Sequence, residues 1–326
     1  MILVYLKKKT VYLQIKPLKK GIVYRSTGSW YVVESERVFY SCRIKGKLRL
    51  EGIQSTNQIA VGDRVFFEID EKAAKPQGSI LKIEERQNYI VRKSVNLSKQ
   101  THIIASNIDQ VFLMITLNNP PTFPAFVDRF LVTAEAYQIP AILLFNKMDS
   151  YDDEELKELR AFKEIYEKIG YLTFEISALK GWSIDELKKL IKNKVGMFAG
   201  HSGVGKSTLL NVIAPELDLK TAPISDLHQQ GTHTTTFAEM FALGDGIKII
   251  DTPGIKGFGV VDMAKDEIGN YFPEFYKLKN QCKFHNCLHQ NEPQCAVIKS
   301  LEQGRIAKSR YDSYIQMLAD DKLHRS

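Results

Sequence analysis

The first part of the chain is a series of short strand-like segments. Apolar and β-branched residues are concentrated in Gly21–Val33, Val38–Ile44, Arg64–Ile69 and Ser79–Ile83. Gly and Ser residues separate these segments, as is usual between strands that are joined by turns. Four or five short strands within about 65 residues predict a small β-barrel, and the OB-fold is one such barrel.

The pattern changes after the predicted barrel. Residues 86–108 are polar, and we expect them to form a connector. Beyond them, apolar runs alternate with runs at helical spacing, which predicts a doubly wound parallel sheet with ligands at the carboxyl ends of its strands. The predicted strands are Val111–Leu117, Ala141–Phe145, Leu172–Ile176, Val195–Ala199 and Ile247–Ile250. The predicted helices are Phe126–Tyr137, Asp152–Ile169 with Gly170 as its stop, and a helix through Ile191 opened by a capping box at Ser183–Glu186.

A phosphate-binding loop follows one of these strands. Gly200–Ser207 has the form G-x-x-x-x-G-K-S, and it lies between a predicted strand and a predicted helix. Glycines let backbone N–H groups approach a phosphate chain, and the helix N-terminus attracts its negative charge. Lys206 would reach the β- and γ-phosphates, and the Ser207 hydroxyl would coordinate Mg²⁺.

Two further motifs predict that the base is guanine. Asn146–Asp149 and Ser177–Ala178 each follow a predicted strand. The Asp149 carboxylate can accept from two adjacent guanine N–H groups, a pair that adenine does not offer. Lys147 can pack its stem on the base, and a backbone N–H near Ser177 can donate to the guanine carbonyl. Each motif alone is a weak signal, but their shared position at strand ends is a strong one.

The remaining motifs of a GTPase surround the last predicted strand. Asp251 ends that strand in the motif Asp-Thr-Pro-Gly, so that Asp251 can hold Mg²⁺ and the Gly254 N–H can meet the γ-phosphate. The polar loop Gly231–Thr236 lies between the P-loop helix and this strand, where a first switch is expected. Three adjacent threonines in the loop are candidate Mg²⁺ ligands, and we favour Thr235.

The residue after Gly254 bears on hydrolysis. Ras-like enzymes carry a glutamine there that orients the attacking water, whereas this chain carries Ile255. Either intrinsic hydrolysis is very slow or another group orients the water. The catalytic candidates are Lys206 and His233, with His201 as a second histidine, and a structural or partner-binding role for His233 has about equal weight. Hydrolysis is therefore expected to wait for a partner that orders the switches.

The motifs occur in an unusual order. In an ordinary GTPase the P-loop comes first, but here the base-reading motif precedes the P-loop by about fifty residues. A circular permutation of the same parallel sheet explains this order. The expected GTP contacts are Asn146, Lys147, Met148, Asp149, Ser177, Ala178, Gly200, His201, Ser202, Gly203, Val204, Gly205, Lys206, Ser207, Thr208, Asp251 and Gly254. The expected Mg²⁺ ligands are Ser207, Thr235 and Asp251.

Charge is distributed unevenly along the chain. Residues 1–102 carry 20 Lys/Arg against 9 Asp/Glu, whereas the remainder carries 25 against 29. A basic front end indicates an anionic partner such as nucleic acid, although a solvated basic face is an equally good interpretation. Basic residues at 43–49 and the aromatic residues Trp30, Tyr31, Phe39 and Tyr40 fit RNA binding, with burial in the barrel core as the alternative for each ring. No apolar run approaches a membrane span, and we expect a cytoplasmic protein.

A group of metal-ligand residues lies near the end of the chain. Cys282, Cys287, His289 and Cys295 offer three thiolates and one imidazole, which suit tetrahedral Zn²⁺. Four protein ligands would close the coordination shell, so we expect a structural site that stabilises a small helical unit. His285 is a rival fourth ligand. Cys42 stands apart and is expected to be a small buried residue.

This order of motifs, with a barrel before and the Cys₃His group after, resembles the RsgA family, also called YjeQ or YloQ. The resemblance covers about Lys20 to Leu318. It implies an OB-fold at 21–85, a circularly permuted GTPase domain at 86–262 and a zinc-binding helical domain at 263–326. It also implies a monomeric GTPase of late small-subunit maturation that contacts 16S rRNA and is stimulated by the 30S subunit, with a hydrophobic residue such as Ile255 replacing the switch glutamine. Residues 1–20 fall outside the resemblance and are either a disordered basic arm or the product of an upstream start codon.

Two other functions are compatible with these residues. An RNA-binding scaffold that holds nucleotide but hardly turns it over is left open by Ile255. A GTPase that acts on tRNA or on membranes is the third hypothesis. No lipidation signal or modification-enzyme motif supports it, although the basic barrel is compatible with tRNA.

Overall fold

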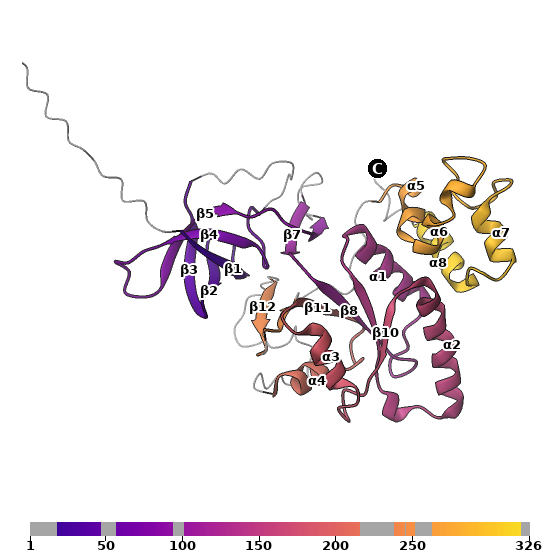
Figure 1. Cartoon of the computed structure of the whole chain (residues 1–326), viewed down its shortest axis with the longest axis horizontal. Coiled ribbons are helices and arrows are strands. Elements are labelled where there is room, and N and C mark those ends of the chain that lie inside the picture. Colours follow the sequence, from indigo (N-terminus) through magenta and orange to yellow (C-terminus); the bar gives the residue numbers. More distant parts are fainter. Residues whose placement is uncertain are drawn as a thin grey trace, which may run out of the picture.

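Three units follow one another along the chain. The structure is a computed structural model and describes residues 18–46, 57–93, 101–215, 238–244, 246–251 and 263–320. A barrel, a parallel sheet with its helices, and a small helical unit appear in this order, with the parallel sheet between the other two (Figure 1). Most of the predicted basic extension lies outside the described residues, but its last two residues, Lys19 and Lys20, belong to the first strand.

The first unit is a closed five-stranded barrel. Its strands are β1 (Lys19–Ser26), β2 (Tyr31–Ser35), β3 (Val38–Ile44), β4 (Arg64–Ile69) and β5 (Gln77–Ile83). They pair in the order β1-β2-β3-β5-β4, and a further β1–β4 pairing closes the barrel. Alternate side chains point inward, so that Val23, Val33 and Phe67 are buried in its core. Cys42 is also buried there, as expected for a small apolar side chain.

The predicted polar connector at 86–108 is wrong. This segment contains β6 (Tyr89–Lys93) and β7 (Thr101–Ser106), which pair antiparallel as a separate two-stranded sheet. Ile90, Ile103 and Ala105 are buried, and Ile90 and Ala105 join the core beneath the parallel sheet. The polar residues between these apolar positions concealed the alternation of a half-buried strand.

The central unit is built on a mostly parallel sheet. Its strands are β8 (Gln110–Ile115), β9 (Ala141–Phe145), β10 (Leu172–Glu175), β11 (Val195–Ala199), β12 (Glu239–Ala242) and β13 (Lys248–Asp251). They lie in the order β10-β9-β8-β11-β13-β12, and only β12 runs antiparallel to its neighbour within this unit. The barrel strand β1 pairs with β12 through Arg25 and Glu239, so the barrel continues directly into the sheet.

Helices cover both faces of this sheet. On one face, α1 (Pro124–Ala136) and α2 (Asp153–Ile169) pack on the sheet, and on the other lie α3 (Ile184–Ile191) and α4 (Lys206–Ile213) (Figure 1). Asp152 and Glu155 form a capping box at the start of α2, and Gly170 ends that helix in the left-handed conformation at φ 114°. The predicted capping box of α3 is wrong, because Ser183 has a φ of 57° and its side chain makes no capping hydrogen bond.

The last unit consists of short helices. These are α5 (Lys265–Ile268), α6 (Pro273–Tyr276), α7 (Ala296–Glu302) and α8 (Lys308–Ala319), with short 3₁₀ turns at Gly269–Tyr271 and Lys279–Gln281. Phe272, Phe275 and Tyr314 form an aromatic core, which Val132 of α1 joins from the central unit. No helix in the described parts of the chain is both long and apolar enough to cross a membrane.

A buried arginine joins the last unit to the central one. Arg310 of α8 is fully buried and donates to Asp128 of α1 at 2.8 Å and to Glu274 of α6 at 2.8 and 3.1 Å. The Tyr166 hydroxyl of α2 donates to the same Asp128 carboxylate at 2.9 Å. Burial raises the pKa of Asp128, and the Arg310 guanidinium opposes that rise. Removing Arg310 would leave two carboxylates, one of them fully buried, without a compensating charge.

Replacing the buried arginine should therefore destabilise the protein strongly. We expect Arg310→Met to lower the free energy of unfolding, measured by urea denaturation, by about 3–5 kcal/mol. Because burial raises the pKa of Asp128, the unpaired carboxyl should take up a proton as the pH falls, so the deficit should be smaller at about pH 5 than at about pH 8.

A half-exposed ion pair between α1 and the residue after α8 provides the control. Arg129 of α1 bridges Asp320, just after α8, at 3.0 Å with side-chain exposures of 37% and 28%. Arg129→Gln should lower the free energy of unfolding by less than about 1 kcal/mol. Equal losses in the two variants would contradict the assigned role of Arg310.

Candidate nucleotide site and metal centre

The predicted nucleotide motifs converge on one edge of the parallel sheet. Strands β8, β9 and β10 end in register, with Ile115 opposite Phe145 and Phe145 opposite Glu175. Strand β11 pairs in parallel with both β8 and β13, so the P-loop and Asp251 leave the sheet at this same edge. The base-reading and phosphate-binding loops are therefore neighbours, although they are far apart in the sequence.

The P-loop backbone has a shape that only glycine accommodates at two points. Gly200 has a φ of 140°, and a Cβ there would lie 2.8 Å from the Met114 carbonyl oxygen. Gly205 has a φ of 102°, and a Cβ there would lie 2.4 Å from Asn146 Nδ2. The Lys206 ammonium group donates to the carbonyl oxygens of Gly200 and His201, both at 2.7 Å. The lysine thus spans the concave side of the loop, where phosphates would replace these carbonyls as its partners.

Asn146 ties the two loops together. Its side-chain N–H donates to the Val204 carbonyl of the P-loop at 2.7 Å, and its side-chain oxygen accepts from the Ala178 N–H at 2.9 Å. Its own carbonyl accepts from the Tyr151 hydroxyl at 3.0 Å. Asn146 is 2% exposed, so these bonds form away from water and hold three loops at a fixed separation.

The predicted guanine-reading residues lie beside this asparagine. The Asp149 carboxylate accepts from the Ser177 hydroxyl, and that hydroxyl accepts from the Lys180 N–H at 3.0 Å. Lys147 has a φ of 68°, and its ammonium group donates to the Asn119 carbonyl. The motif therefore presents a fixed carboxylate at the sheet edge, as a guanine site requires.

The loop between β8 and α1 also borders the nucleotide site, although no sequence motif indicated this. The segment Asn119-Pro120-Pro121 follows the buried strand β8, and the Asn119 carbonyl accepts from the Lys147 ammonium group. The imidazole of His201 forms a tilted stack with Phe126 of α1, with ring centroids 4.1 Å apart and ring planes inclined by 31°. The proline pair directly after a buried strand was the one available signal, because α/β sites form in such loops.

Several predicted site residues lie outside the described parts of the chain. Gly254, Ile255, Thr235 and His233 are among them, and the side chain of Asp251 is also not described. Ser207 and Thr208 lie in the first turn of α4, and Ser202 is exposed on the P-loop. The structure thus brings together the P-loop, the base motif and Ser177–Ala178. It leaves the switch residues and the catalytic role of His233 as predictions.

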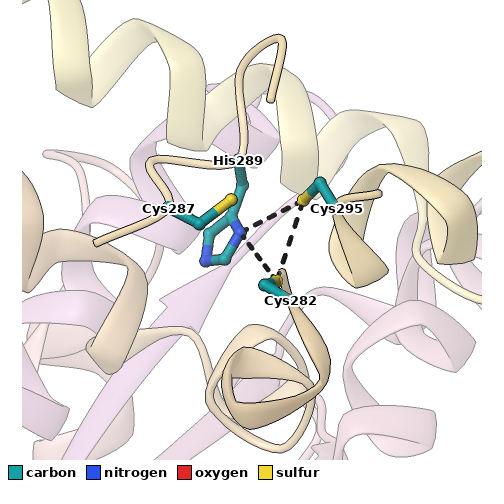
Figure 2. A group of neighbouring side chains, drawn as sticks. All are labelled: Cys282, Cys287, His289 and Cys295. Atoms are coloured by element: carbon teal, nitrogen blue, oxygen red, sulfur yellow. Dashed lines mark hydrogen bonds between the residues drawn. The ribbon is translucent and has the colours of Figure 1, made fainter. Parts of the chain in front are cut away.

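The four predicted metal ligands form one compact cluster. One ligand atom from each of Cys282, Cys287, His289 and Cys295 lies within 4.8 Å of the others (Figure 2). The His289 Nδ1 atom is 3.7 Å from Cys282 Sγ and 3.3 Å from Cys295 Sγ, and the two sulfurs are 4.0 Å apart. Tetrahedral zinc with Zn–S bonds of about 2.3 Å needs ligand atoms about 3.5–3.8 Å apart. The cluster could hold one zinc ion.

The surrounding chain fixes the histidine that completes this cluster. The backbone carbonyls of Leu288 and His289 accept from the hydroxyls of Tyr314 and Tyr311, both at 2.7 Å. Burial lowers the pKa of His289, which favours the neutral imidazole that binds metals. Burial also raises the pKa of the Cys287 thiol to about 12. The rival ligand His285 is exposed and is not part of the cluster.

Comparison with known proteins identifies the family. Residues 83–261 match the model of the RsgA GTPase, and residues 20–75 match that of the RsgA N-terminal domain. The chain belongs to the RsgA GTPase family. It is therefore a GTP hydrolase, and an RsgA GTPase works with Mg²⁺ bound to its nucleotide.

Individual RsgA relatives match over nearly the full chain. A protein of Christiangramia forsetii named small ribosomal subunit biogenesis GTPase RsgA is 61% identical over 93% of this chain and 96% of its own length. The crystal structure of YjeQ from Thermotoga maritima superposes with a TM-score of 0.76 at 33% identity, covering 94% of this chain and 99% of that one. YloQ, described as a circularly permuted GTPase, superposes with a TM-score of 0.71 at 27% identity, covering 94% and 96%. The inferred permutation and the RsgA resemblance are both confirmed.

Zinc content should distinguish the two candidate histidines. We expect the purified protein to contain one zinc ion per chain by mass spectrometry, and His289→Ala to lose most of it because a closed four-ligand shell is broken. The exposed His285→Ala variant should retain the metal. A zinc loss in the His285 variant with retention in the His289 variant would reverse the assignment of the fourth ligand.

The guanine preference should depend on Asp149. Asp149→Asn removes a charged acceptor of two N–H groups, so GDP affinity measured by calorimetry should fall about 10- to 100-fold. The matched control is Asp153→Asn, an exposed aspartate at the start of α2, which should bind GDP like the wild type. Unchanged GDP affinity in the Asp149 variant would rule out its predicted role.

Proposed function

We propose that this chain is a GTPase that binds the 30S ribosomal subunit and hydrolyses GTP in response to it during late small-subunit maturation. The observation that carries the proposal is the 61% identity, over almost the full chain, to a relative named for small-subunit biogenesis. Its nucleotide contacts are those predicted from the motifs, with Mg²⁺ held by Ser207, Thr235 and Asp251. The protein works in the cytoplasm as a monomer.

The proposed domain division follows the three units of the fold. The barrel occupies residues 21–85, the permuted GTPase domain 86–262 and the zinc-binding helical domain 263–326, after a basic extension at 1–20. In this division the barrel and the helical domain lie on either side of the GTPase domain (Figure 1). Each of the two outer domains then offers its own surface to ribosomal RNA.

An exposed aromatic and basic surface on the barrel supports contact with 16S rRNA. The Arg43 guanidinium lies 3.8 Å from the centre of the Trp30 ring, and Trp30 is 37% exposed. Phe39, on the same strand as Arg43, is 51% exposed. Tyr31 and Tyr40 are buried and belong to the barrel core. Exposed rings beside arginines provide stacking surfaces for unpaired bases.

A second such surface lies next to the metal cluster. Tyr276 is 62% exposed and Phe284 is 40% exposed. The Lys283 ammonium group lies 5.6 Å from the centre of the Phe284 ring. Since Phe284 falls between two of the metal ligands, the cluster would fix the position of this ring against RNA.

The dependence on a partner follows from the missing glutamine. Ile255 at that position has no side-chain amide to orient the attacking water. In this proposal the 30S subunit orders the switch segments, Lys206 stabilises charge on the phosphates, and His233 orients the water.

The test is GTP turnover by the purified protein alone, with mature 30S subunits and with 50S subunits. We expect a 30S-specific rise of at least about tenfold, because a partner that completes a GTPase site acts mainly on turnover. His233→Ala should reduce that rise. A flat, slow rate under all conditions would contradict the proposal and favour the nucleotide-holding scaffold that Ile255 leaves open.

A further inference from the structure

Helix α1 packs against the sheet and against the metal-binding unit at the same time. Val127, Phe130, Leu131 and Ala134 of this helix are buried in the core beneath the sheet. Val132 belongs instead to the core of the C-terminal unit, and Ala136 packs against that core. Asp128 lies one turn before Val132 and holds Arg310 of α8. The spacing 128-132-136 places these three residues on one face of α1, and this face contacts the C-terminal unit.

The beginning of the same helix contacts the nucleotide motifs. Phe126 stacks on His201 of the P-loop, with ring centroids 4.1 Å apart. In the preceding loop, Pro120 lies against Gly203, where an added Cβ would be 3.5 Å from its Cδ. Within three residues along α1, the chain thus passes from a P-loop contact at Phe126 to the buried ion pair at Asp128.

We propose that α1 couples the metal-binding unit to the nucleotide site, with Phe126 as a positioning residue of the P-loop and the Asp128–Arg310 pair as the attachment of the unit. The inference rests on the proposed nucleotide site but does not require the ribosome. A change that loosens the unit shifts α1, and the ring stack passes this shift to the P-loop backbone at His201. The reverse holds as well, because a coupling between two binding equilibria is reciprocal.

Two features make this connection suitable for coupling. A buried ion pair is either formed or broken, and coupling is carried by elements with discrete arrangements of this kind. The helix is also short, since 13 residues correspond to about 20 Å. If the Asp128–Arg310 ion pair were purely structural, the result would differ. Breaking the pair would then lower the melting temperature and leave the nucleotide affinity unchanged.

The test compares two substitutions on α1 that both weaken contacts with the C-terminal unit. Asp128→Asn removes one carboxylate and leaves Arg310 paired with Glu274, so the buried charges stay balanced and the fold is retained. Its dissociation constant for GDP, measured with a fluorescent methylanthraniloyl derivative, should rise at least about fivefold. Arg129→Gln, which removes only the half-exposed bridge to Asp320, should stay within about twofold of the wild type.

A second variant tests the route through the ring stack. In a Phe126→Leu background, the added effect of Asp128→Asn on the GDP dissociation constant should disappear, because the connection to His201 is already lost. An undiminished effect would show that the coupling bypasses Phe126 and would overturn its assigned role. A lower melting temperature of Asp128→Asn with an unchanged GDP dissociation constant would reduce the ion pair to a clamp and overturn the proposal.

The reciprocal measurement uses the wild-type chain and does not depend on the folding of any variant. Saturating GDP should slow hydrogen exchange of the backbone amides in α8 by at least about fivefold. Unchanged exchange on GDP binding would overturn the coupling while leaving the proposed nucleotide site intact. Failure of the wild type to bind GDP at all would instead reject the nucleotide site, and the coupling with it.

Discussion

The hydrogen bonds of Asn146 are the constraint on which the nucleotide site depends. This buried side chain fixes the P-loop to the loop after β10, while its backbone carbonyl accepts from Tyr151. These bonds require only that β9, β10 and β11 end at one edge of the sheet. They place no condition on the order in which the chain visits the strands. The permuted motif order is therefore compatible with the site, because the spatial neighbours are preserved.

The features that the sequence could predict are those that a local pattern of residues determines. Strong local patterns, such as the helical spacing of apolar residues in Asp152–Ile169 and the glycine stop at Gly170, predicted these elements nearly at their observed bounds. The predicted capping box at Ser183 is absent, and the capping box that the structure contains, at Asp152, was not predicted. Spacing of four ligand residues gave the metal cluster, because thiolates and imidazole in that arrangement have few other uses. The permutation followed from motif order alone, since each motif carries its own physical requirement.

What the sequence missed depends on contacts between distant residues. The strands at Tyr89–Lys93 and Thr101–Ser106 are half-buried, and their polar residues hid the alternation. Asp128 lies within the predicted helix Phe126–Tyr137, but its partner Arg310 is 182 residues away and no local pattern connects them. The stacking of His201 on Phe126 is equally long-range. Such pairs become visible only when the units are packed together.

The proposed function depends on a single guanine-specific nucleotide site at the sheet edge. The most direct measurement is calorimetric titration of the purified chain with GDP and with ADP in the presence of Mg²⁺. One GDP should bind per chain, and ADP should bind at least about a hundredfold more weakly, because adenine offers the Asp149 carboxylate no pair of adjacent N–H donors. Comparable affinities for the two nucleotides would contradict a guanine-specific site.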